Sequence, residues 1–264
     1  MLNLSNTTFI IPVCVESQDR LNNAKTVLGY LNHHFNTNVI IHELSNGESK
    51  LPFLHEFNNL NIEHIVEESD LSTYHRTRQL NEMLDIVKTK VVVNYDIDVL
   101  LPVPTYIKAT DMILNDKSDI VYPYGDGVYQ KRIFTTFNRD RFDFEFDLDY
   151  ITENDYDMWD AKYGHCMFLN TDKYKSCGGE NELFIAYGPE DTERYERFVK
   201  IGYKVDRIND IVYHLEHSRT PFSDMTNQHF NNNNVLYQTL KNMSKEEIIN
   251  YYKNITYKDK YKTF

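Results

Sequence analysis

Several features common in proteins are scarce in this chain of 264 residues. Its three cysteines, Cys14, Cys166 and Cys177, are odd in number and far apart, which excludes a disulfide framework and a zinc-type cysteine motif. Long apolar runs are also missing, so the sequence predicts neither a signal peptide nor a transmembrane helix, which needs about 18 apolar residues. We therefore expect a cytoplasmic protein without a membrane span.

Positive charge is scarce as well: 28 Lys and Arg stand against 40 Asp and Glu, a net charge of −12. Nucleic acid is therefore not an expected partner, because phosphate binding needs clustered basic residues. The C-terminal residues 241–264 are locally basic, which predicts a plain helix or a peripheral contact with the anionic inner face of a membrane. We predict a main domain in residues 1–220, followed by a basic helical tail, residues 221–264, packed on it or extending from it. The oligomeric state stays open.

The hydrophobic pattern alternates between strand-like and helix-like segments. Strands are predicted at residues 7–15, 38–44, 62–68 and 91–97, and helices at 20–35 and 72–87. This alternation predicts an α/β fold whose central, mostly parallel sheet is flanked by helices and binds ligands at the carboxyl ends of its strands. Further along, we expect strands at 164–170 and within 204–217, a helix at 190–201, and a strand or hairpin with one charged face at 141–150.

Two aspartates end the fourth predicted strand, in the string VVVNYDIDVLLP. Asp96 and Asp98 are two residues apart and therefore lie on the same face of an extended chain. Carboxylates this close repel each other unless a cation lies between them. Because hard oxygen ligands favour Mg²⁺ or Mn²⁺, the pair predicts a divalent-metal site that also holds diphosphate oxygens.

Two other segments, one before and one after this strand in the chain, carry groups suited to phosphate and sugar chemistry. HRTRQLN begins a helix with Arg76 and Arg78, whose guanidinium groups fit phosphate, although ordinary surface arginines give the same pattern. AYGPED places Tyr187 before Glu190 and Asp191, which open a helix. The helix dipole alone favours acidic residues in a first turn, but it does not explain the aromatic residue beside them.

A fourth segment, VYHLEHSR, carries two histidines. Strand alternation places His214 and Glu216 on one face, and His217 on the opposite face or at the end of the strand. The spacing differs from the H-E-x-x-H string of zinc proteases. Either histidine could be structural or could ligate a metal.

In this order, the four segments resemble the nucleotide-sugar glycosyltransferases of the GT-A fold, and most of all the galactosyltransferase-like group of family 7 and related family 2 enzymes. The resemblance runs from about residue 9 to residue 219. It implies a Rossmann-like sheet flanked by helices, with a smaller antiparallel portion on the acceptor side. It also implies Mn²⁺ or Mg²⁺ as the cofactor and a UDP-sugar as the donor.

The same resemblance implies roles for individual residues on the donor side. Asp98 would bind the metal directly, Asp96 would bind ribose, metal or both, and His217, in preference to His214, would complete the metal site. Glu43 would accept the uracil N–H, and Arg76 would be the main donor contact of its helix. The implied nucleotide contacts are Pro12, Val13, Arg20, Glu43, Arg76 and Asp96.

On the acceptor side, Asp191 would be the catalytic base and Glu190 would hydrogen-bond a sugar. Tyr187 stands where related sequences have a sugar-stacking Trp. The implied substrate contacts are Tyr187, Gly188, Gly179 and Asp126, with Tyr124, Gly127 and His165 as further candidates for the sugar pocket.

These residues predict a metal-dependent transfer of a hexose or N-acetylhexosamine from a UDP-sugar to a hydroxyl of a saccharide or glycolipid acceptor, with inversion at the anomeric carbon. One alternative is a nucleotidyltransferase acting on sugar phosphates, although the turn after the first strand lacks the expected glycine-rich loop. Another is an inactive carbohydrate-binding or scaffold protein. The sequence leaves the sugar and the acceptor open.

Overall fold

The computed structural model describes residues 1–220 and 224–255. Its strands are β1 (Leu2–Cys14), β2 (Phe35–Ser45), β3 (Leu60–Glu68), β4 (Val91–Tyr95), β5 (Val99–Leu100), β6 (Ile120–Tyr122), β7 (Gly127–Ile133), β8 (Tyr156–Ala161), β9 (Cys166–Asn170), β10 (Val205–Arg207) and β11 (Val212–Leu215). Its α-helices are α1 (Gln18–His34), α2 (Arg76–Ile86), α3 (Val103–Leu114), α4 (Arg139–Glu145), α5 (Thr171–Ser176), α6 (Glu190–Ile201), α7 (Phe230–Lys241) and α8 (Lys245–Asn254). Two short 3₁₀ helices, η1 (Pro52–Glu56) and η2 (Leu148–Tyr150), complete the described elements.

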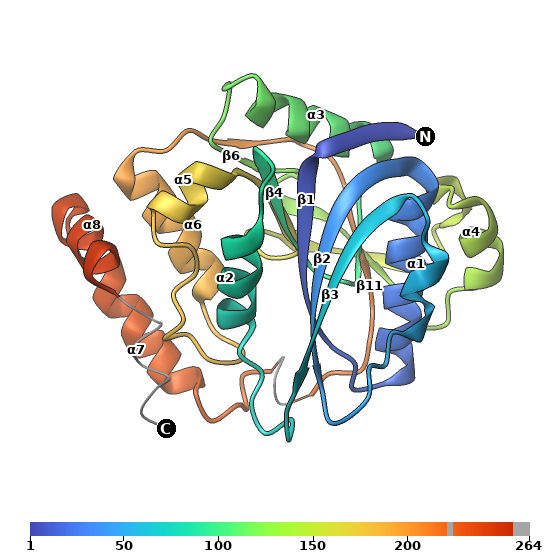
Figure 1. Cartoon of the computed structure of the whole chain (residues 1–264), viewed down its shortest axis with the longest axis horizontal. Coiled ribbons are helices and arrows are strands. Elements are labelled where there is room, and N and C mark those ends of the chain that lie inside the picture. Colours follow the sequence, from blue (N-terminus) through green and yellow to red (C-terminus); the bar gives the residue numbers. More distant parts are fainter. Residues whose placement is uncertain (221–223, 256–264) are drawn as a thin grey trace.

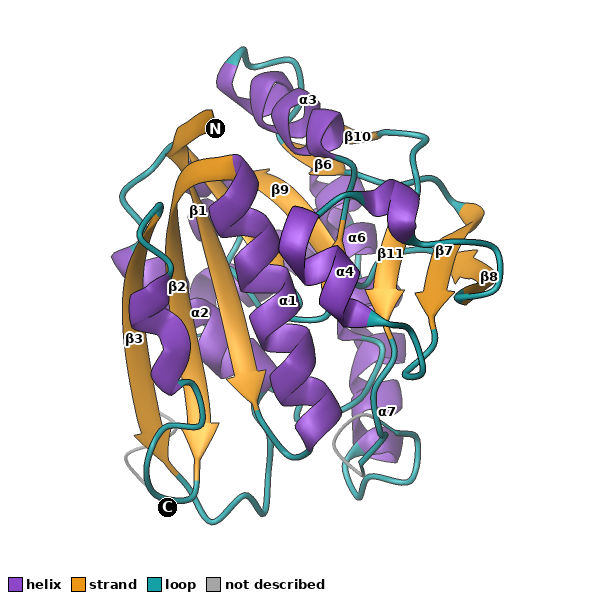
Figure 2. Cartoon of the chain, turned by 90° about the vertical axis from the view of Figure 1, so that its right-hand side faces the viewer, coloured by secondary structure: helices purple, strands orange, loops and turns teal. Residues whose placement is uncertain are grey.

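The larger sheet has seven strands in the order β10-β6-β9-β4-β1-β2-β3. β1 pairs in parallel with β2 and β4, and β2 in parallel with β3, whereas β9 runs antiparallel to β4 and β6. α1 and α2 cover opposite faces of this sheet (Figures 1 and 2). The predicted α/β fold with a mostly parallel sheet is confirmed, and the carboxyl ends of its parallel strands form one edge, where a ligand can bind.

The smaller sheet has four strands in the order β5-β11-β7-β8 and lies beside the larger one (Figure 2). β11 pairs antiparallel with β5, and β7 antiparallel with β8, but β11 and β7 are parallel. The smaller portion is therefore mixed rather than purely antiparallel. A long crossover separates β7 from β11 in the chain, which permits the parallel pairing.

Residues 141–150 form α4 and η2, so the prediction of a strand or hairpin there is wrong. The Asn138 side chain caps α4 by accepting the Asp140 N–H. Phe142 and Phe146 are four residues apart and both pack against Tyr30, while the alternate apolar residue, Phe144, is 81% exposed. The alternation of apolar and acidic residues therefore reflects helical spacing, with one phenylalanine left in solvent.

The C-terminal helices α7 and α8 pack against α6 through a second, smaller apolar cluster. Phe184, Tyr237, Leu240, Ile248 and Tyr252 make a small apolar cluster between α7, α8 and the loop before α6. The predicted basic tail thus contains two helices, while residues 221–223 and 256–264 lie outside the described part. No helix in that part combines the length and the apolar character needed to cross a membrane.

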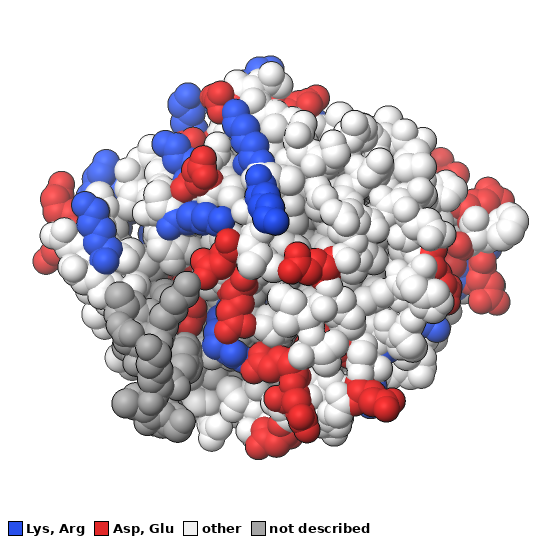
Figure 3. Space-filling view, in the orientation of Figure 1, with Lys and Arg blue, Asp and Glu red and all other residues white. Residues whose placement is uncertain are grey.

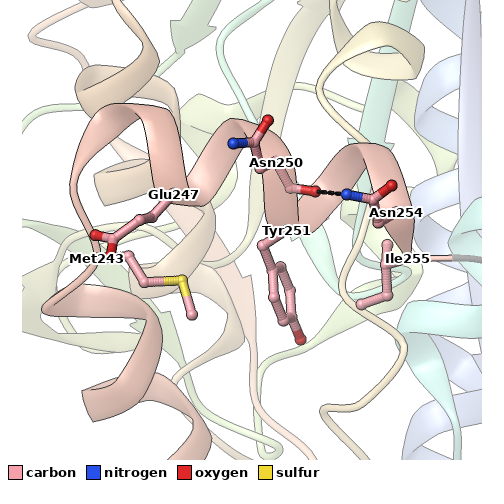
Figure 4. Close-up of a pocket in the computed structure, with 6 residues that line it drawn as sticks. All are labelled: Met243, Glu247, Asn250, Tyr251, Asn254 and Ile255. Carbon is pink, nitrogen blue, oxygen red and sulfur yellow. Dashed lines mark hydrogen bonds between the residues drawn. The ribbon is translucent and has the colours of Figure 1, made fainter.

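A hollow of about 490 Å³ lies along α8, bordered by Met243, Glu247, Asn250, Tyr251, Asn254 and Ile255 (Figure 4). Its one carboxylate, Glu247, already accepts the Ser244 N–H in a capping box, and Asn254 bonds back to the Asn250 carbonyl. Apart from the Tyr251 phenol, the described lining offers no further ionisable group. On the face shown in Figure 3, basic side chains are interspersed with acidic ones.

Candidate active site

A cavity of about 470 Å³ lies at the carboxyl ends of β1 and β4, facing the start of α6. Segments far apart in the sequence meet there because parallel strands end at one edge of the sheet. Its lining comprises Pro12, Cys14, Glu16, Arg20, Tyr74, Arg76, Asp96, Ile97, Asp98, Lys162, Tyr163, Gly164, His165, Ala186, Tyr187, Gly188, Glu190, Asp191, Thr192, His214, His217 and Arg219. All four sequence segments that suggested chemistry contribute to it.

Asp98, His214 and His217 form a compact cluster on one wall of the cavity. One ligand atom from each lies within 4.8 Å of the others, and His217 Nε2 is 3.1 Å from Asp98 Oδ2. Burial alone would raise the pKa of Asp98, but the two imidazoles hold it well below its ordinary value. One carboxylate and two imidazoles suit Mn²⁺ or a similar borderline cation better than Mg²⁺, which prefers oxygen ligands. The residues present therefore fit a divalent metal.

Asp96, the other half of the acidic pair, contacts an arginine instead of this cluster. Arg76 Nη2 donates to Asp96 Oδ1 at 2.7 Å and lies 3.3 Å from Asn94 Oδ1. Arg76 Nη1 is 3.8 Å from Asp191 Oδ1. The guanidinium group therefore links the end of β4 to the start of α6, across the cavity.

Glu190 and Asp191 begin α6 and occupy different electrostatic settings. Glu190 is only 8% exposed, and burial together with the neighbouring Asp191 raises its pKa to about 8. Its Oε2 atom has no hydrogen-bond partner among the described residues. Asp191 instead accepts a hydrogen bond from Arg194, whose Nε lies 3.1 Å from Glu180 Oε1. Adjacent carboxyl groups in such contrasting surroundings are typical of acid–base sites.

The loop before α6 forms an aromatic wall. Tyr187 is 39% exposed and stacks on Phe230 with ring centroids 6.0 Å apart. Asn233 Nδ2 donates to the carbonyls of Ile185 at 2.8 Å and Tyr187 at 3.1 Å. Gly188 packs so closely on Asn233 that a Cβ would lie 2.7 Å from Nδ2. Helix α7, outside the four segments read from the sequence, therefore holds this loop in place.

Val13 and Glu43, predicted as nucleotide contacts, do not line the cavity. They are register partners in the β1–β2 pair and share a face, whereas Pro12 and Cys14 point to the other face and do line it. Glu43 is fully buried and accepts hydrogen bonds from Ser49, the Lys50 N–H and His64. Both carboxylate oxygens of Glu43, predicted to accept the uracil N–H, are therefore already hydrogen-bonded within the chain.

Several other candidates also lie away from the cavity lining. Asp126 is exposed, and the Gly179 carbonyl accepts from Arg197 Nη2 at 2.9 Å. Arg78 binds Glu67 and Glu82 instead of facing the cavity. Tyr124 and Gly127 are likewise absent from the lining, whereas Pro12, Arg20, Arg76, Tyr187, Gly188 and His165 belong to it.

A second cluster of metal-ligand type, His42, Glu67 and Glu82, lies on β2, β3 and α2. Arg78 already pairs with both of its carboxylates, with Nη2 2.8 Å from Glu67 Oε2 and Nη1 3.1 Å from Glu82 Oε1. Burial lowers the pKa of His42. A guanidinium group therefore already offsets part of the negative charge of this cluster.

The segment Lys162–His165 was largely missed from the sequence, where only His165 was a candidate. β9 runs antiparallel to β4, so the residues just before β9 lie at the carboxyl end of β4. The His165 carbonyl accepts the Asp96 N–H at 3.0 Å, and its Nε2 lies 3.1 Å from Gln130 Oε1. The available signal was the position of AKYGH at the start of the strand predicted for residues 164–170.

Comparisons with known proteins agree with this architecture. Residues 150–218 match the family model described as the N-terminal domain of galactosyltransferase. This range contains Glu190, Asp191, His214 and His217 but not the D-x-D pair. The search of curated protein sequences found no match.

Solved structures resemble the chain in fold. S. aureus TarS, residues 1–349, superposes with a TM-score of 0.53 at 13% identity, covering 79% of this chain and 60% of that one. A longer S. aureus TarS structure gives 0.52 at 12% identity, covering 80% and 36%. The mannosyltransferase PcManGT from Pyrobaculum calidifontis, in complex with GDP-Man and Mn²⁺, gives 0.49 at 15% identity, covering 80% and 56%.

The chain thus spans between 36% and 60% of the length of these three structures. The two TarS structures, at 13% and 12% identity, are evidence of fold alone, and the family match adds evidence from sequence over residues 150–218. Both agree with the resemblance drawn from the sequence: the chain has a GT-A-like fold, and residues 150–218 are similar to the galactosyltransferase family model.

Proposed function

We propose that this protein transfers a hexose or N-acetylhexosamine from a UDP-sugar to a hydroxyl group of a saccharide or glycolipid acceptor, with inversion. The observation that carries the proposal is the pairing of two chemistries in one cavity: a metal-ligand cluster on one wall, and two contrasting carboxyl groups at the start of α6 on the other. A transferase of this type needs a leaving-group stabiliser and a base on opposite sides of the anomeric carbon.

On the donor side, Asp98, His214 and His217 would hold a divalent cation, which when bound neutralises the diphosphate leaving group as a Lewis acid. Arg20 and Arg76 line the same cavity and supply guanidinium donors for phosphate oxygens. Arg76 already bridges carboxylates from both walls, so it would orient the donor between them.

On the acceptor side, Asp191 accepts the proton of the attacking hydroxyl group at a carboxylate oxygen. The hydroxyl oxygen forms a bond to the anomeric carbon while the bond from that carbon to the diphosphate oxygen breaks. Glu190, whose pKa of about 8 keeps it protonated at neutral pH, donates a hydrogen bond to a sugar oxygen. Tyr187 offers a ring face to the sugar, at the mouth of the loop that leads into α6.

The test is release of UDP from a panel of UDP-sugars in the presence of Mn²⁺ or EDTA, with GDP-mannose as a nucleotide control. We expect Mn²⁺-dependent release from at least one UDP-sugar, and a loss of roughly a hundredfold or more in Asp191→Asn, as for removal of a general base. Asp172→Asn is the matched control, because Asp172 is an exposed acid in the first turn of α5, outside the cavity lining. Activity in Asp191→Asn equal to that of wild type would refute the assignment of the base.

A further inference from the structure

Trp159 is the chain's only tryptophan, and the structure holds it on the protein surface in a fixed orientation. It lies in β8 and is 48% exposed. The Arg132 guanidinium group packs 4.0 Å from the centre of the ring, and the indole Nε1 donates to Asp157 Oδ2 at 3.0 Å. Arg132 Nε also donates to Asp157 Oδ1 at 2.8 Å. We call Trp159, Arg132 and Asp157 the outer platform.

The strand register places the outer platform on the same face of the smaller sheet as the metal-ligand histidine. Arg132 pairs with His214 on one side and with Asp157 on the other. Paired residues on adjacent strands share a face, and Trp159, two residues from Asp157, shares it too. Adjacent strands are spaced by about 4.8 Å, so β8 lies roughly 10 Å from β11.

Polar contacts connect this face to the cavity. His214 Nδ1 lies 3.2 Å from Glu216 Oε1, and the charge of Glu216 acts in turn on Arg132. Gln130, the register partner of Trp159, approaches His165 in the cavity lining at 3.1 Å. The outer platform is therefore linked through neighbouring side chains to His165 and His214, which line the cavity.

We propose that the outer platform binds a sugar unit of the acceptor at a distance from the reacting hydroxyl group, so that the acceptor is an oligosaccharide or polysaccharide. This inference rests on the proposed transferase function. An exposed aromatic ring offers an apolar face to the C–H groups of a sugar, while Arg132 and Asp157 offer a donor and an acceptor for its hydroxyl groups. The separation of roughly 10 Å from the metal-ligand strand corresponds to about two linked sugar rings.

A protein partner suits this surface less well. A stable protein interface buries a broad area with an apolar core. Here a single aromatic ring is flanked by an ion pair, and the exposed Met158 beside it pairs with Lys131 on the opposite face of the strand. One ring with hydrogen-bonding neighbours matches a saccharide.

The experiment measures binding of the full chain to a glycan array and follows the positive glycans by isothermal titration calorimetry, which serves wild type and variants alike because it does not depend on the single tryptophan. We expect array binding to oligosaccharides of several units, and a loss of roughly tenfold or more in affinity for Trp159→Ala, from the removal of one aromatic stacking contact. Met158→Ala is the matched control, since it removes a similarly exposed apolar side chain from the other face of the same strand.

Three results would overturn the proposal: no glycan whose binding weakens in Trp159→Ala, an equal loss in Met158→Ala, or an altered oligomeric state in Trp159→Ala with glycan binding unchanged. The last would mark β8 as a contact between copies of the chain. Hydrolysis of UDP-sugars needs no acceptor, so it reports on the transferase function separately. If hydrolysis of UDP-sugars is intact but no glycan binding depends on Trp159, the outer-platform proposal fails while the proposed transferase function stands.

Discussion

Replacing Glu190 by glutamine should make the protein more stable, and increasingly so as pH rises. Glu190 is 8% exposed, and burial followed by the charge of Asp191 raises its pKa from 4.5 to about 8. The folded state therefore binds a proton at this position over a pH range in which the unfolded chain has released it. As pH rises from about 4.5 towards about 8, wild type loses stability through this group. Glutamine cannot ionise and escapes that loss.

The size of the effect follows from one proton. A difference of one bound proton between the folded and unfolded states changes the free energy of unfolding by about 1.4 kcal/mol per pH unit. Across about two pH units inside that range, the stability advantage of Glu190→Gln over wild type should therefore grow by about 2–3 kcal/mol. Other titrating groups are common to both proteins and cancel in the difference.

Urea unfolding followed by circular dichroism, at about pH 5.5, 6.5 and 7.5, measures this difference directly. The two curves should draw apart steadily with pH. A difference that stays constant across the series would show that Glu190 ionises normally, and the reasoning from burial would then be wrong. We also expect Glu190→Gln to be less active, because active-site residues commonly trade stability for function.

Three further outcomes can be measured on single variants. Arg194→Met should lower the free energy of unfolding by about 3–5 kcal/mol in urea, because it leaves the buried Glu180 carboxylate without its cation; an unchanged midpoint would contradict the pairing. His214→Ala and His217→Ala should each weaken Mn²⁺ binding in calorimetry by tenfold or more, on the order of one lost ligand, whereas an effect in only one of them would reduce the cluster to two ligands. Asn233→Ala should lower UDP-sugar turnover while leaving Mn²⁺ affinity unchanged, since it frees the loop before α6; unaltered turnover would show that α7 does not position that loop.

The sequence was informative about elements and less so about the direction of side chains. The predicted helix at 190–201 coincides with α6, because its apolar spacing and its first-turn acids both favour a helix. The alternation at 141–150 misled, because phenylalanines four residues apart fit a helix as well as a strand.

Within the site, alternation along β1 and β2 separates the predicted residues that line the cavity from those that do not. Pro12 and Cys14 line it, whereas Val13 and its register partner Glu43 do not. Neighbouring residues of one strand thus differ in whether they reach the cavity, and which of them does so depends on the sheet register. The contact of Asp96 with Arg76 depends on how α2 packs against β1 and β2 of the sheet, which no local pattern encodes. The Asn233 contacts likewise need the tertiary fold, since α7 lies more than forty residues from the loop that it holds.

The central claim is that Asp98 and the two histidines form a metal site that binds the diphosphate of the donor. Calorimetric titration of UDP into the protein, with Mn²⁺ or with EDTA, tests it most directly. We predict UDP binding that requires Mn²⁺, that is lost in Asp98→Asn and that persists in Asp172→Asn, a change at an exposed acid outside the cavity lining. Equal UDP affinity in EDTA, equal affinity in Asp98→Asn, or no UDP binding with Mn²⁺ present would contradict the account.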